Sequence, residues 1–189
     1  MNIEVDITGV VLKTERLVLR EWKESDLQDF FEYCSVEGVG EMAGWAHHEN
    51  IEKSKQILDL FIKEKKTFCI ELEGKAIGSG GIEKYNEKEF PEYDNLKGRE
   101  VGFVLSKDYW GRGIMPEAVK GVLAYCFDTL GCDFVACGHF EWNGQSRRVQ
   151  EKCGFHYVKT IDYTTRMGTH EKSMENVLFK DEFEKSRRA

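Results

Sequence analysis

The chain lacks the features of a membrane-spanning, exported or zinc-binding protein. No stretch approaches the roughly 18 consecutive apolar residues of a membrane helix, and the start, Met-Asn-Ile-Glu-Val-Asp, has neither the basic nor the apolar segment of a signal peptide. There is no Cys-x-x-Cys pair, and the five histidines do not have zinc-finger spacing. His47 and His48 are interpreted as part of an exposed loop before a helix rather than as metal ligands. We therefore expect a cytoplasmic protein with no membrane partner and no metal.

The chain also has no excess of positive charge. Its 189 residues have a formal net charge of −7, so we expect neither the basic face of a general nucleic-acid binder nor a nucleic-acid partner. A negatively charged protein attracts a cationic substrate such as an amine. Most of the six cysteines lie in apolar periodic segments, and without an export signal we expect them to be reduced thiols.

Few breaks interrupt the chain, which has only two prolines and no repeat, linker or low-complexity tract. Its apolar pattern predicts one domain over residues 1–189, with a core at about 11–179 and a charged, frayed tail at 180–189. The polar segment 86–98 is expected to be an exposed loop. Strands are predicted at 11–22, 67–72, 76–85, 99–105, 134–140, 155–163 and 173–179, and helices from Ser25 or Asp26, Asn50, Met115 and Asn143. This alternation indicates a mixed α/β domain.

The segment from Arg99 to Ile114 carries the most information. An apolar strand pattern ends there, a Gly-Arg-Gly turn follows, and a helical pattern begins at Met115. Glycines allow a tight bend and a close approach to a ligand, and the first amides of the new helix favour an anion. A Walker loop is absent, and Pro116 stands where a dinucleotide fingerprint needs its third glycine. We predict a phosphate-binding turn; the alternative is a plain turn between a strand and a helix.

Three segments, Thr14–Arg20, Tyr109–Ala118 and Asn143–Phe155, together resemble the GCN5-related N-acetyltransferases (GNAT). Within that superfamily the chain is most similar to the RimJ/RimL-type branch, which acetylates protein N-terminal amines. The resemblance covers roughly Val11 to Phe179. One departure is Asp108, which stands where the superfamily usually has Gln or Arg, so one cation is missing near the expected pyrophosphate site.

The resemblance implies a central, mostly antiparallel sheet of six to seven strands that contains a splayed parallel pair and is flanked by four helices. It implies that acetyl-CoA is the cosubstrate; no metal is expected, because the cysteines and histidines lack metal-ligand spacing. The expected partners are therefore acetyl-CoA and an amine acceptor, and the expected assembly is a monomer or a homodimer.

The resemblance also implies which residues bind the cofactor, with the turn amides holding the pyrophosphate. Asn143 has helix capping as an alternative role, and for Arg147 the alternative is a solvated helix face. Gly102 leaves room for the pantetheine arm or for packing. The expected cofactor-binding residues are Phe103, Val104, Leu105, Gly111, Arg112, Gly113, Ile114, Asn143, Arg147 and Lys152.

Two residues are candidates for the chemistry. Glu100 is expected to deprotonate or orient the amine, directly or through water, because a carboxylate at a buried strand position has a raised pKa. The alternative is an exposed strand glutamate paired with a lysine. By resemblance, Ser146 is expected near the thioester sulfur, as a hydrogen-bond donor or water relay.

The acceptor is expected to enter between the loops Ser35–His48 and Thr164–His170. Core packing is the alternative for the tryptophan in the first loop. Residues expected to line this entrance are Met42, Trp45, Tyr163 and Arg166.

The sequence thus indicates an acetyl-CoA-dependent N-acetyltransferase that acts on a primary amine by direct attack in a ternary complex. A protein or peptide N-terminal amine is the expected acceptor. A covalent enzyme intermediate is disfavoured because no cysteine sits in a recognisable nucleophile motif. Two alternatives stay open: an enzyme for a small amine (a polyamine, amino sugar or amino acid), and a non-catalytic module that binds acyl-CoA.

Overall fold

A computed structural model describes residues 1–188, and Ala189, the last residue of the predicted tail, lies outside the described residues. The strands in this part of the chain are β1 (Leu12–Lys13), β2 (Leu17–Arg20), β3 (Thr67–Leu72), β4 (Lys75–Glu83), β5 (Gly98–Leu105), β6 (Phe134–Phe140), β7 (His156–Thr164) and β8 (His170–Phe179). The α-helices are α1 (Leu27–Cys34), α2 (Ile51–Glu64), α3 (Ile114–Ala124), α4 (Gly144–Cys153) and α5 (Lys180–Ser186). A π-helical turn, Tyr125–Thr129, continues α3.

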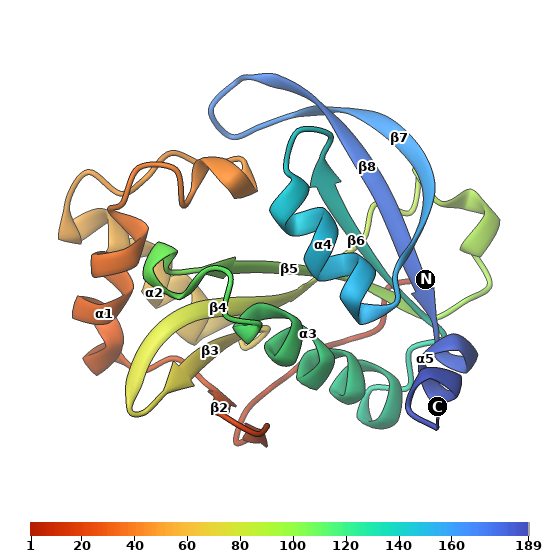
Figure 1. Ribbon diagram of the computed structural model, residues 1–189, viewed down its shortest axis with the longest axis horizontal. Helices are drawn as coiled ribbons and strands as arrows, with labels where there is room; N and C mark the ends of the chain where they lie inside the picture. The colour runs from red at the N-terminus through yellow and green to blue at the C-terminus, as the bar shows by residue number, and fades with distance from the viewer. Residues whose placement is uncertain (189) are drawn as a thin grey trace.

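The described strands form one open mixed sheet in the order β1-β2-β3-β4-β5-β6-β8-β7 (Figure 1). Only β5 and β6 pair in parallel within it. The predicted mixed α/β fold with one parallel pair is confirmed. The sheet has eight strands rather than six or seven, because a turn divides the predicted strand 11–22 into β1 and β2. At that turn the amide of Thr14 donates to the carbonyl of Leu17 at 3.0 Å.

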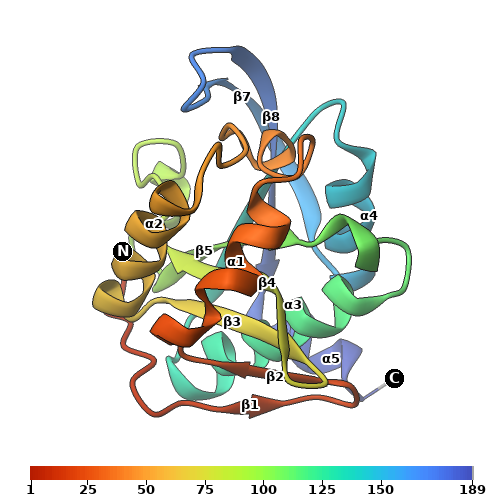
Figure 2. The same ribbon diagram turned by 90° about the vertical axis from the view of Figure 1, so that its left-hand side faces the viewer.

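Helices cover both faces of the sheet, as the alternation of side chains along β3 requires. Cys69 faces α1 and α2 in a cluster with Trp22 and Phe30. Its neighbours Phe68 and Ile70 point the other way, into the main core beneath α3. Figure 2 shows α1 and α2 on one side of the sheet and α3 and α4 on the other. The two faces therefore carry separate apolar clusters.

The segment between β4 and β5 is partly buried, although the sequence predicted an exposed loop. Phe90 is only 2% exposed, and its ring stacks on Tyr93 with centroids 5.8 Å apart. Tyr93 in turn packs against Phe134 of β6 at 4.9 Å. Most residues of this segment are exposed, as predicted, and polar neighbours masked the two aromatic anchors that hold it.

The tail is also more ordered than the sequence predicted. It forms α5, a fifth helix where four were expected. The ring of Phe183 is 4% exposed and packs on Phe127 with centroids 5.0 Å apart. The carboxylate of Glu182 accepts the amide of Phe179 at 2.9 Å at the helix start. One buried aromatic ring thus fixes a segment that is otherwise charged.

The parallel pair splays, as the resemblance implied. β5 and β6 pair only through Gly98–Phe134, Arg99–Val135 and Glu100–Ala136. Beyond this point the residues 101–105 of β5 and 137–140 of β6 do not pair with each other. A gap therefore opens in the middle of the sheet, between the second halves of β5 and β6.

We predict that Phe183→Ala destabilises the fold by about 3–5 kcal/mol, because it deletes a buried aromatic ring and leaves a cavity. Urea unfolding followed by circular dichroism measures this loss. The matched control is Lys185→Ala in the same helix, whose exposed side chain should leave the urea midpoint unchanged. An unchanged midpoint for Phe183→Ala would show that α5 does not dock on the core.

Candidate functional site

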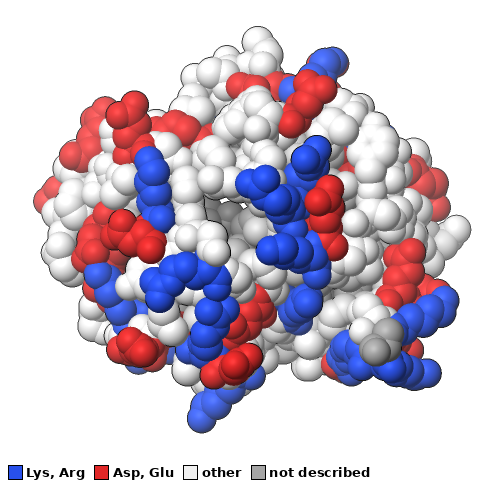
Figure 3. Space-filling view, viewed as in Figure 1, with Lys and Arg blue, Asp and Glu red and all other residues white. Residues whose placement is uncertain are grey.

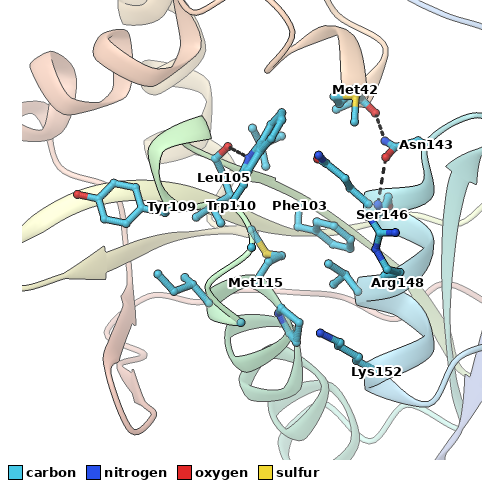
Figure 4. Close-up of a pocket in the computed structure, with 18 of the residues that line it drawn as sticks. Met42, Phe103, Leu105, Tyr109, Trp110, Met115, Asn143, Ser146, Arg148 and Lys152 are labelled. Atoms are coloured by element: carbon cyan, nitrogen blue, oxygen red, sulfur yellow. Dashed lines mark hydrogen bonds between the residues drawn. The ribbon is translucent and has the colours of Figure 1, made fainter.

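A cavity of about 240 Å³ lies between the end of β5, the start of α3, and α4 (Figure 4). Arg148 and Lys152 of α4 line it, and in the described residues no Asp or Glu does. We call it the cationic cavity. Its walls include most of the predicted cofactor-binding residues: Phe103, Val104, Leu105, Gly111, Gly113, Ile114, Asn143 and Lys152.

The Gly-Arg-Gly turn forms one wall of the cationic cavity. Gly111 and Gly113 have φ values of 74° and 72°, the left-handed region that favours glycine. Within residues 1–188, the amides of residues 111–113 donate no hydrogen bond to the protein. The turn is held from behind by Arg16, whose guanidinium donates to the carbonyl of Arg112 at 3.0 Å and to Glu117 at 2.7 Å. These free amides at the start of α3 suit an anion.

Neither of the two predicted cofactor-binding arginines lines this cavity. The guanidinium of Arg112 lies over the ring of Tyr109, 5.1 Å from its centroid. Arg147 is exposed and lies 3.6 Å from Glu151, as the solvated alternative describes. Arg148, the next residue on α4, lines the wall instead. Figure 3 shows lysine and arginine side chains gathered around the hollow in the middle of this face.

Asn143 caps α4 and also ties it to the acceptor loop. Its side-chain oxygen accepts the amide of Ser146 at 3.0 Å, and its side-chain nitrogen donates to the carbonyl of Met42 at 3.0 Å (Figure 4). Capping, the alternative from the sequence, is therefore present. Because Asn143 is only 4% exposed and lines the cavity, it fixes where Ser146 and Met42 lie.

A buried amide orients the hydroxyl group of Ser146. Gln150 Nε2 donates to Ser146 Oγ at 3.2 Å and to the carbonyl of Gly138 at 3.0 Å. Its Oε1 accepts from Asn176 at 2.9 Å. Ser146 Oγ is therefore the acceptor of its bond with Gln150, and the hydroxyl proton is free to point into the cavity. The sequence did not single out Gln150 or Asn176. The only signal was that Gln150 is a polar residue on the buried side of a helix.

A second cavity, of about 250 Å³, lies next to the first. Glu89, Glu100 and Glu175 line it, and in the described residues no lysine or arginine does. We call it the acidic cavity. The two cavities share the residues Met42, Ala43, Phe103 and Ser146. They therefore meet at the gap that β5 and β6 leave in the sheet.

Two glutamates of the acidic cavity hold protons more tightly than usual. Glu100 is half-buried in the cavity wall, where removal from water, followed by the charges of Glu175 and Glu83, raises its pKa to about 7. Within the described residues it has no lysine partner, so the ion-pair alternative does not hold. Burial also raises the pKa of Glu175, although the Ser173 hydroxyl group, 2.6 Å away, opposes this.

The predicted entrance residues divide into two groups. Met42 and Tyr163 line the acidic cavity. Trp45 packs instead against His48, with ring centroids 5.2 Å apart, as the core-packing alternative describes. Arg166 has an exposed side chain, and its amide donates to the carbonyl of Gly44 at 3.0 Å. The two loops therefore do meet beside the cavity.

The described residues contain no group of three or more His, Cys, Asp or Glu that is arranged to hold a metal ion. All six cysteines are buried and unpaired. Every helix in residues 1–188 is too short or too polar to span a bilayer.

Comparisons with known proteins identify the family and the fold. A family model described as "Acetyltransferase (GNAT) domain" matches residues 16–156. The uncharacterized N-acetyltransferase YoaA of Bacillus subtilis is 26% identical over 152 residues, which cover 77% of this chain and 82% of that protein. Ribosomal-protein-S5-alanine acetyltransferase from Vibrio fischeri superposes with a TM-score of 0.70 at 21% identity, covering 92% of this chain and 98% of that one. RimJ from Mycobacterium smegmatis, solved in complex with CoA-disulfide, gives a TM-score of 0.75 at 16% identity, covering 95% and 91%.

The family match spans most of the chain and includes β5, the turn, α3 and α4. The two structural matches share its fold. The resemblance drawn from the sequence is therefore confirmed, and the chain belongs to the GNAT family as an acetyl-CoA-dependent N-acetyltransferase.

Proposed function

We propose that the acceptor is the N-terminal amine of a protein or peptide and that this amine attacks acetyl-CoA directly. One observation carries the direct attack by an amine: a cationic and an acidic cavity meet at Ser146. The cationic cavity would attract the anionic cofactor, and the acidic cavity would attract the cationic amine. The reacting atoms would then face each other across the gap in the sheet.

The residues of the cationic cavity fit coenzyme A. The free amides of residues 111–113 would hold the pyrophosphate, and Arg148 and Lys152 would neutralise the phosphates. The end of β5, which has no partner on its β6 side, would present backbone groups to the pantetheine arm. When bound, acetyl-CoA supplies the activated acetyl group.

Two residues would share the proton transfers. Glu100 would take one proton from the protonated amine, and the neutral nitrogen would then attack the thioester carbon. As the carbon–sulfur bond breaks, the leaving sulfur would take the second proton of the nitrogen, and the Ser146 hydroxyl group would donate a hydrogen bond to that sulfur. Because an α-amino group titrates near pH 8, about 1 unit above the pKa of Glu100, a strong base is not required.

A covalent route through an enzyme thiol is disfavoured. Cys137 lines the acidic cavity, but it is fully buried, and burial holds its thiol pKa well above the usual value. At neutral pH it is a thiol, which is a poor nucleophile. Direct attack needs no such intermediate.

The choice of an N-terminal amine rests on similarity. The matched structures include a RimJ protein and a ribosomal-protein-S5-alanine acetyltransferase. Acetyl-CoA-dependent thiol release, measured with peptides against polyamines, amino sugars and amino acids, tests this choice. Turnover restricted to the small amines would support the small-molecule alternative, and cofactor binding without turnover would support a binding module. Assembly as a monomer or homodimer and a cytoplasmic location stay predictions.

We predict that Arg148→Gln weakens acetyl-CoA binding about three- to tenfold, because it removes a cation from the cavity wall. Isothermal titration measures the dissociation constant. Arg147→Gln is the matched control, since this neighbouring arginine lies outside the cavity. Equal losses in the two variants would contradict the assignment of Arg148.

We predict that Glu100→Gln lowers kcat by about 10²–10⁴-fold, because the general base is lost. In the parent enzyme kcat/KM should rise with pH up to about 7, as Glu100 becomes ionised. This rise of kcat/KM with pH should be absent in Glu100→Gln. A variant that keeps the parent pH profile would exclude Glu100 as the base.

We predict that Ser146→Ala and Gln150→Leu each lower kcat by about tenfold, since both remove a correctly oriented hydroxyl donor. In the double variant the losses should not add, because Gln150 acts through Ser146. Thermal unfolding and the acetyl-CoA dissociation constant control for damage to the fold. Fully additive losses would contradict the coupling.

A further inference from the structure

Two carboxylates face the acidic cavity without a cation. Glu175 is 6% exposed, and its Oε1 accepts the hydroxyl proton of Ser173 at 2.6 Å. Within residues 1–188, Glu175 Oε2 has no hydrogen-bond partner, and Glu100 has no hydrogen-bond or ion-pair partner at all. Burying a carboxylate without a cation is costly. A cationic ligand would satisfy both groups.

The sheet brings these two carboxylates to the same face. Glu100 of β5 is in register with Ala136 of β6, and Glu175 of β8 is in register with Gly138. Residues 136 and 138 point to the same side of β6. The glutamates therefore flank β6 from its two neighbouring strands.

Gly138 makes room for the carboxylate of Glu175. A Cβ at position 138 would lie 2.9 Å from Glu175 Oε1 and 3.0 Å from Ser173 Oγ. The carboxylate of Glu175 therefore lies over the bare backbone of β6, on the side toward Glu100. A side chain at this position would push it away.

The neighbouring groups leave this pair free for a ligand. Lys159 is engaged with Glu92 at 2.8 Å and with the carbonyl of Glu89. His139 and Lys159 lower the pKa of Glu175 by less than its burial raises it, and the charge of Glu89 raises it further. The hydrogen bond from Ser173 favours the charged form of Glu175, whereas Glu100 has no such bond. Glu175 is thus suited to bind a cation, and Glu100 to accept a proton.

We propose that Glu175 is an ammonium-binding residue, which together with Glu100 binds the charged form of the acceptor amine beside Ser146. The proposal rests on the proposed function and adds the charge state in which its acceptor binds. The acceptor is a basic amine that is protonated before it binds, rather than a neutral aromatic amine or an alcohol. Glu175 holds the nitrogen while Glu100 removes one ammonium proton; the second proton is lost as the nitrogen attacks and passes to the leaving thiolate.

The first test measures binding of n-butylammonium to the CoA-saturated protein by isothermal titration, with n-butanol as the uncharged probe. Glu175→Gln should weaken n-butylammonium binding by about tenfold or more, because a charge-assisted hydrogen bond is lost. Glu171→Gln, the same change on the same strand outside the acidic cavity, should leave it unchanged. Parent-like binding in Glu175→Gln, or equal binding of n-butanol to the parent protein, would overturn the proposal.

Two further measurements distinguish a role of Glu175 in amine binding from a role in stabilising the fold. Gly138→Ala should reduce n-butylammonium binding as Glu175→Gln does, because it displaces the carboxylate without removing its charge. Without amine, Glu175→Gln should raise the unfolding temperature, since it removes a buried carboxylate that has no cation. A lowered temperature with parent-like binding would assign Glu175 a structural role only.

Thiol release from acetyl-CoA distinguishes this proposal from the proposed function. Glu175-dependent binding of n-butylammonium without turnover of any amine would sustain the ammonium site and reject the catalytic roles. Turnover with an unchanged acceptor KM in Glu175→Gln would reject the ammonium site and sustain the enzyme.

Discussion

The site depends on the point where β5 and β6 stop pairing. After Glu100 and Ala136 the strands diverge, and the sheet that separates α1 and α2 from α3 and α4 is open there. Backbone groups on the open side of β5 lose their ladder partners and become available to a ligand. The cationic cavity, the acidic cavity and their junction at Ser146 all lie around this opening.

Placing carboxylates away from water in the acidic cavity lowers the stability of the fold. In the folded chain the pKa of Glu100 is about 7, above its ordinary value of 4.5. Between these two pH values the folded state binds more protons than the unfolded state, so stability falls as the pH rises. The acidic cavity therefore destabilises the protein at the pH where its carboxylates are ready to bind an amine. Unsatisfied groups of this kind are common where a fold serves a ligand.

The sequence contained the local part of this arrangement. The Gly-Arg-Gly turn, the helix after it and the cap at Asn143 follow from short-range patterns. Glu175, Gln150 and Arg16 could not be found in that way, because their roles depend on strand register and on contacts across the sheet. For the same reason α5 was missed: a single ring, Phe183, docks an otherwise charged segment.

The central claim is that cofactor and amine occupy adjoining cavities at the same time. Initial velocities measured while acetyl-CoA and the acceptor are both varied test it most directly. Intersecting lines in a double-reciprocal plot are the predicted result, since both ligands must be bound before acetyl transfer. Parallel lines, the signature of an acetylated enzyme intermediate, would contradict the account.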